Sequence, residues 1–185
     1  MFSIIKNVFR AKQWWNFIIP PVVGFVYFIG IFSEYNIPEF TKIICMVFLS
    51  AIAMAMFGFF LNDITDIELD KIAGKQNFTS STSKAEKIGI IIFTLTLATI
   101  PWFIINSSII SKILIGLQII LLALYSIPPI RLKRFSICCI TFDSFYSGLI
   151  SIFAIIFINP KVIENMQYPL WSLLFLGLTL LLRGL

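Results

Sequence analysis

Long runs of apolar residues alternate along the chain with short polar segments, and the runs lack the two-residue alternation of β-barrel strands. Each run approaches the roughly 20 residues that a helix needs to cross the hydrocarbon core of a bilayer. The pattern predicts an all-α, polytopic transmembrane bundle with six spans in one domain, residues 1–185. The predicted spans are Trp14–Phe32, Ile43–Leu61, Ile88–Ile105, Ile109–Ile127, Ile137–Ile158 and Tyr168–Leu185.

The composition also places the chain in the membrane class. Hydrophobic residues make up 59% of it and charged residues 12%, whereas soluble domains carry about 25% charged residues. There is no histidine, and the three cysteines lack the C-x-x-C spacing of zinc or redox sites. A bound metal would therefore need oxygen ligands, which favours a hard cation such as Mg²⁺.

The basic residues indicate an orientation in the membrane. Eleven lie on the side of the N-terminus and only three on the other, which predicts that the N-terminus is cytoplasmic, in a cell inner or plasma membrane. They sit at span ends and form no stripe interleaved with aromatic residues, so we expect no nucleic-acid partner. The eleven are Lys6, Arg10, Lys12, Lys71, Lys75, Lys84, Lys87, Arg131, Lys133, Arg134 and Arg183, and the three are Lys42, Lys112 and Lys161.

Acidic residues gather just after the second span, in "FFLNDITDIELDKIAGKQN", residues 59–77. If the span continues as a helix, Asn62, Asp63, Asp66 and Asp70 fall within about 100° of arc, whereas Glu68 points away. We call these four residues the acidic stripe. Like charges at this spacing repel one another, so a positive group should lie against them.

Two interpretations of the acidic stripe stay open. The first is a solvated cap of the helix, with Lys71 and Lys75 as local partners. The second is an open Mg²⁺ site, because one or two carboxylates, retained waters and substrate phosphates are the usual ligands of Mg²⁺.

A basic segment, "LYSIPPIRLKRF" (residues 124–135), follows the fourth span on the same predicted side as the acidic stripe. Pro128 and Pro129 end the span. Arg131, Lys133 and Arg134, together with the hydroxyls of Tyr125 and Ser126, can bind phosphate oxygens. Ordinary anchoring of positive charge at the membrane surface is the alternative for each single residue.

"NDITDIELD" followed by "YSIPPIRLKR" resembles the UbiA superfamily of membrane prenyltransferases, whose motifs are N-D-x-x-D-x-x-x-D and Y-[ST]-x-P-P-x-R-x-K-R. "FRAKQWWNFIIPP" also resembles that family's entry into its first helix. "FDSFYSG" is similar to a stretch of the branch that prenylates carotenoids. The likeness covers nearly the whole chain in order and spacing.

The resemblance implies Mg²⁺-dependent transfer of an isoprenyl group from an isoprenyl diphosphate to a lipophilic acceptor, such as a quinone precursor, a tetrapyrrole, a carotenoid or a lipid. Aromatic faces of Phe57, Phe59, Phe60 or Tyr146 would shelter the allylic cation. The implied metal ligands are Asn62, Asp63, Asp66 and Asp70; the implied catalytic residues are Asp66, Asp70 and Asp143; and the implied diphosphate ligands are Lys71, Lys75, Tyr125, Arg131, Lys133 and Arg134.

The chain departs from the family pattern at two places. "GKQNFTSS" stands where the family has K-x-x-R-P, and the family's second Asp-rich motif, expected after the sixth span in a fold of about nine helices, is not present by Leu185. We therefore expect a prenyltransferase domain truncated at its C-terminus and inactive by itself.

Asp143 lies within a predicted span, where an acid is a functional candidate, although pairing with Arg131 or Lys133 is an equal alternative. A cation-coupled transporter or channel subunit and an inactive membrane scaffold are the competing function classes.

Overall fold

The computed structural model describes residues 19, 22–24, 26, 29–30, 34–135 and 150–159. Its α-helices are α3 (Ile37–Ile72), α4 (Lys84–Ile104), α5 (Ile109–Ser126) and α7 (Ile150–Ile156), and two short 3₁₀ helices, η1 (Phe78–Ser81) and η2 (Leu132–Arg134), follow α3 and α5. This part of the chain contains no strand, which confirms the all-α class for it.

Three helices, α3, α4 and α5, are long and apolar enough to cross a membrane, so the chain is a membrane protein. They confirm the predicted apolar helices at Ile43–Leu61, Ile88–Ile105 and Ile109–Ile127. Most of the predicted span Trp14–Phe32 and all of Tyr168–Leu185 lie outside the described residues. Of Ile137–Ile158 only residues 150–158 are described, and Ile150–Ile156 of these form α7. A total of six spans remains a prediction.

Helix α3 is longer than a membrane requires. Its 36 residues extend about 54 Å at a rise of 1.5 Å each, whereas the hydrocarbon core is about 30 Å thick. The helix starts at a capping box between Asn36 and Glu39. It ends at Ile72, and the chain then turns at Gly74, whose φ of 67° lies in the left-handed region that glycine adopts readily. The acidic stripe therefore continues the spanning helix without a break.

The helices are held together by apolar packing and by a few buried polar contacts. Ser50 in α3 donates to the carbonyl of Ala98 in α4 (2.6 Å) and accepts from Trp102 Nε1 (2.7 Å). Ser111 in α5 donates to the carbonyl of Ala154 in α7 (2.7 Å). Each bond satisfies a polar group that would be costly to leave unpaired in lipid.

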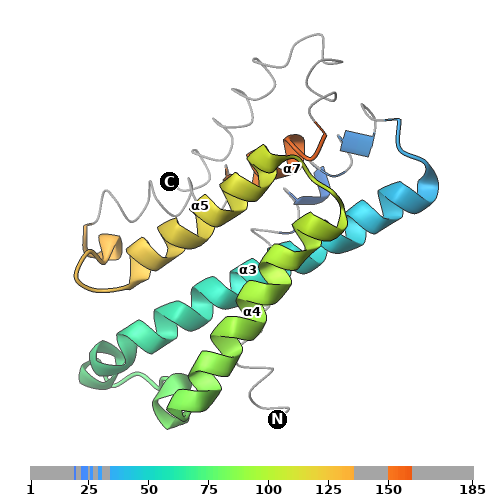
Figure 1. Ribbon diagram of the computed structural model, residues 1–185. Helices are drawn as coiled ribbons and strands as arrows, with labels where there is room; N and C mark the ends of the chain where they lie inside the picture. The colour runs from blue at the N-terminus through green and yellow to red at the C-terminus, as the bar shows by residue number, and fades with distance from the viewer. Residues whose placement is uncertain are drawn as a thin grey trace.

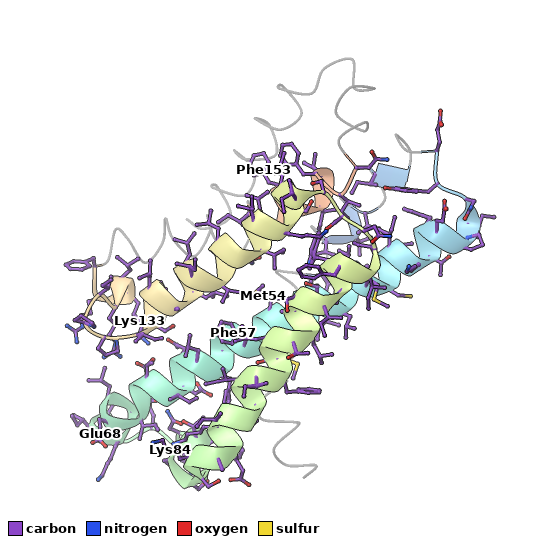
Figure 2. The ribbon with its side chains drawn as sticks, in the orientation of Figure 1. Met54, Phe57, Glu68, Lys84, Lys133 and Phe153 are labelled. Atoms are coloured by element: carbon purple, nitrogen blue, oxygen red, sulfur yellow. The ribbon has the colours of Figure 1, made fainter. Side chains whose placement is uncertain are left out.

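The ends of α3 and α5 and the start of α4 lie at one end of the bundle (Figure 1). In Figure 2 Glu68, Lys84 and Lys133 mark this end, whereas Phe153 of α7 lies at the other. The acidic stripe and the basic segment therefore share one end of the bundle, as the sequence predicts. Which side of the membrane this end faces remains a prediction.

We expect this end of the bundle to be cytoplasmic, because of the eleven-to-three distribution of basic residues. In a variant without Cys45, Cys138 and Cys139, a cysteine replacing Ser80 should react with an impermeant thiol reagent only after the cells are permeabilised. A cysteine replacing Glu34, which precedes α3, should react in intact cells. Both positions are exposed, whereas the nearby Thr79 is fully buried and would not report. The reverse labelling pattern would show that the orientation is wrong.

Candidate functional site

The acidic stripe occupies the last turns of α3. Asn62, Asp63, Asp66 and Asp70 are all half-buried, whereas Glu68 is exposed, as the helical phase predicts. The regular helix to Ile72 therefore gives these side chains a common face. Electrostatic repulsion along that face needs compensation from other elements.

The basic segment reaches the acidic stripe from the end of α5. Gly58 permits a close approach of the two helices, because a Cβ there would come within 3.1 Å of Leu122 Cδ2. One turn further along, α5 ends at Ser126, and a cis Pro128–Pro129 bond follows. Arg131 has a φ of 39°, a left-handed conformation that costs a non-glycine residue about 1–2 kcal/mol. The loop thus turns back toward α3.

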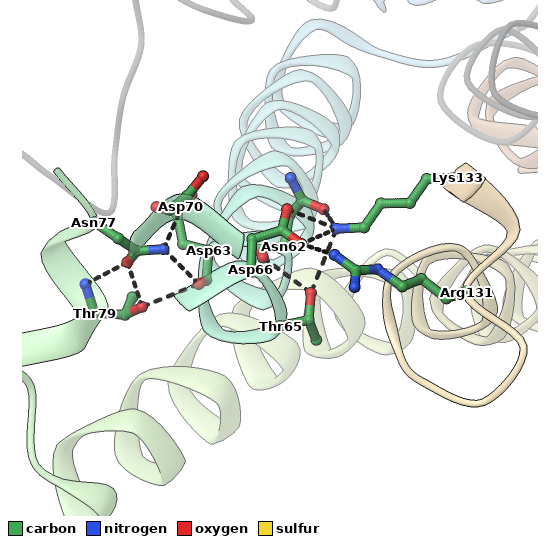
Figure 3. A network of polar contacts seen from close by, with 9 residues as sticks. All are labelled: Asn62, Asp63, Thr65, Asp66, Asp70, Asn77, Thr79, Arg131 and Lys133. Carbon is green, nitrogen blue, oxygen red and sulfur yellow. Dashed lines mark hydrogen bonds and ion pairs between the residues drawn. The ribbon is translucent and has the colours of Figure 1, made fainter. Parts of the chain in front are cut away.

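Asp66 is the centre of the contact between the two elements (Figure 3). Lys133 Nζ donates to both of its carboxylate oxygens at 2.7 Å, and Arg131 Nη2 donates to Oδ1. Lys133 also donates to Asn62 Oδ1 and lies 3.5 Å from Thr65 Oγ1. We call Asp66, Arg131 and Lys133 the Asp66 clasp. The expectation of a positive group against the acidic stripe is confirmed.

The Asp66 clasp has more positive than negative charge. Two cations share one carboxylate, and their side chains are 9% and 13% exposed. Burial lowers the pKa of Lys133, and the hydrogen bond and charge of Asp66 offset this only in part. Arg131 Nε is buried with no hydrogen-bond partner among the described residues. The clasp therefore has one positive charge and one N–H donor that Asp66 does not satisfy, which favours a further anionic oxygen acceptor.

A second set of contacts reaches the acidic stripe from the opposite side, through η1 (Figure 3). Asn77 Nδ2 donates to Asp70 Oδ2 (2.7 Å) and to the main-chain carbonyl of Asp63 (2.8 Å). Thr79 Oγ1 lies 2.6 Å from Asn77 Oδ1 and 3.1 Å from the same carbonyl. Sequence reasoning missed both residues. Their signal was an Asn two positions before a Thr, the spacing of an Asx-turn.

The other predicted diphosphate ligands lie less centrally. Lys71, Lys75 and Arg134 are exposed, and their side chains have no hydrogen bond or ion pair within the described part of the chain. Lys71 and Lys75 are thus not the local partners that the helix-cap interpretation required. Tyr125 is half-buried in the last turn of α5. The predicted Asp143 and Tyr146 lie outside the described residues.

The chemistry of the donors fits an open Mg²⁺ site. Among the described residues, no three Asp, Glu, Cys or His side chains are grouped so that they could hold a metal by themselves. Asn62, Asp66 and Asp70 nevertheless present oxygen donors on one helix face, and Asp70 Oδ1 has no hydrogen bond or ion pair to another described residue. One or two carboxylates suffice when substrate phosphates complete the coordination of Mg²⁺.

No family model, curated protein or solved structure matches this chain.

Proposed function

We propose that the chain binds an isoprenyl diphosphate with Mg²⁺ at the cytoplasmic end of its helices, and that this is the donor site for Mg²⁺-dependent transfer of the isoprenyl group to a lipophilic acceptor in the membrane. The main support is the Asp66 clasp, in which a carboxylate of the acidic stripe contacts two cations of the basic segment. Asp66 and Arg131 are 65 residues apart in the sequence, so only the fold brings the acidic stripe and the basic segment together. The UbiA resemblance supplies the substrate class.

The charges of the site suit a diphosphate ester. Lys133 and Arg131 would exchange part of their contact with Asp66 for phosphate oxygens, and the unpartnered Arg131 Nε provides one further donor. This exchange would leave the oxygens of Asp66, Asn62 and Asp70 available to the metal. Bound Mg²⁺ would neutralise negative charge that develops on the departing diphosphate.

The apolar part of the substrate would lie along the membrane-embedded part of the bundle. Phe57 and Phe60 are buried in α3, 4% and 2% exposed, within two turns of Asn62, and Phe59 is half-buried. Their ring faces can stabilise an allylic cation by cation–π attraction. The electron pair of the acceptor then forms the new bond to carbon, while the carbon–oxygen bond to diphosphate breaks and the acceptor gives up a proton to water or an acid.

Binding of the donor tests this proposal directly. The purified chain in detergent should retain labelled farnesyl or geranylgeranyl diphosphate only when Mg²⁺ is present, and excess inorganic pyrophosphate should displace it. With a suitable acceptor, prenyl transfer should release pyrophosphate.

Retention that does not depend on Mg²⁺, or no retention at all, would contradict the proposal. Uptake of a cation into vesicles that contain this chain and no diphosphate would instead favour the cation-coupled transporter class.

A further inference from the structure

The two carboxylates that face the proposed metal site are held in different ways. Asp66 contacts two cations, Arg131 and Lys133, whereas the bond to Asp70 comes from the neutral amide of Asn77. A neutral donor orients a carboxylate without cancelling its charge. Asp70 is therefore oriented by a neutral donor, and no ion pair joins it to a cation of the described residues.

The orientation of the Asn77 amide follows from its neighbours. The carboxylate of Asp70 and the carbonyl of Asp63 only accept hydrogen bonds, whereas the main-chain N–H of Thr79 only donates, at 2.9 Å. A flipped amide would place oxygen against two oxygens and NH₂ against an N–H. Nδ2 must therefore face Asp70, and Oδ1 must face Thr79.

Asn77 is itself fixed relative to α3. Its bond to the main-chain carbonyl of Asp63 ties the amide to the helix backbone, and Thr79, which is 0% exposed, contacts both groups. The turn at the end of α3 supports this arrangement: Lys75 N donates to the carbonyl of Asp70 (2.8 Å) and Gly74 N to that of Lys71 (3.2 Å). This Schellman turn directs the chain back along the helix.

We propose that Asn77, supported by Thr79, is a positioning residue that holds Asp70 by one oxygen, Oδ2, and directs the other, Oδ1, to Mg²⁺ as a single-oxygen ligand. The inference rests on the proposed function. Groups that orient metal ligands in this way typically change metal affinity by about 10–100-fold when they are removed.

The test measures how the binding of inorganic pyrophosphate to the purified chain depends on Mg²⁺ concentration. Asn77→Ala should raise the Mg²⁺ concentration for half-saturation roughly tenfold, while pyrophosphate affinity at saturating Mg²⁺ and the melting temperature stay near those of the wild type. Thr79→Val should show the same shift, and Thr79→Ser should restore wild-type behaviour, because serine keeps the hydroxyl. Ser81→Ala, in the same turn, is the control and should change nothing, because the Ser81 hydroxyl is exposed and donates to the main-chain carbonyl of Phe78.

A double-mutant cycle shows whether Asn77 acts through Asp70. In an Asp70→Ala background, Asn77→Ala should cause no further shift in the Mg²⁺ dependence. An unchanged Mg²⁺ dependence in Asn77→Ala, or an equal shift in both backgrounds, would overturn the positioning role. Wild-type protein that shows no Mg²⁺-dependent binding would overturn the proposed function and this inference together, whereas the first two results leave the proposed function intact.

Discussion

Replacing Asp66 by Asn should abolish prenyl transfer, whereas Glu68→Gln should leave it nearly unchanged. Asp66 faces Arg131 and Lys133 on the acidic stripe, while Glu68 is exposed on another face of the same helix. The loss of a charged ligand from the site should lower kcat by at least about 100-fold, the effect of removing one preorganised electrostatic group. Pyrophosphate release from a labelled donor, at matched expression and membrane insertion, is the measurement.

Asp66→Asn also leaves Arg131 and Lys133 without their carboxylate partner, so a loss of activity must be separated from a loosened loop. The same variant should therefore be tested for Mg²⁺-dependent pyrophosphate binding and for its melting temperature in detergent. A lower melting temperature with normal Mg²⁺ dependence would assign Asp66 a structural role. Equal loss of turnover from Asp66→Asn and Glu68→Gln would show that the acidic stripe is not the metal site.

The described helices could be predicted well, because hydrophobic run length is a strong signal in a membrane. The predicted span Ile109–Ile127 corresponds to α5, Ile109–Ser126. The span Ile43–Leu61 is only the middle of α3, which starts at Ile37 and ends at Ile72. Its boundaries were harder to predict because they depend on capping by Asn36 and on the turn at Gly74, neither of which affects hydropathy.

The pairing between the acidic stripe and the basic segment was partly predictable. Helical phase places Asp66 on the stripe, and the alternation of loops brings the basic segment to the same end. The sequence does not show which of Lys133 and Arg134 contacts Asp66. In the structure Lys133 belongs to the Asp66 clasp, whereas Arg134 is exposed. That difference accompanies the left-handed conformation of Arg131, which the residue type does not predict.

The contacts of Asn77 were also hard to predict, because they too depend on the conformation of a turn in the folded chain. The stretch "GKQNFTSS" departs from the family pattern at this point, so the resemblance gave no role to Asn77. Only the folded turn brings Asn77 within 2.7 Å of Asp70 Oδ2, seven residues earlier in the chain. Local turn chemistry identifies an Asx-turn, but not the carboxylate against which the turn packs.

Lys133→Ala should weaken the binding of inorganic pyrophosphate at saturating Mg²⁺ by about 100-fold, near the upper end of the range for a hydrogen bond to a charged group. Lys133 is mostly buried and supplies its ammonium group at the point where the basic segment meets the acidic stripe. Displacement of a labelled isoprenyl diphosphate in detergent provides the measurement. Lys112→Ala is the matched control, because Lys112 lies at the other end of α5, 5.1 Å from the centroid of the Phe103 ring.

The binding of Mg²⁺ alone should respond in the opposite direction. Lys133 occupies oxygens of both Asp66 and Asn62, so its removal leaves these donors more accessible to a cation. Weaker pyrophosphate binding together with equal or stronger Mg²⁺ binding would therefore distinguish a ligand-binding role from general damage, which lowers both. Equal pyrophosphate affinity in Lys133→Ala and Lys112→Ala would contradict the diphosphate role, because it would reduce the basic segment to an anchor at the anionic membrane surface.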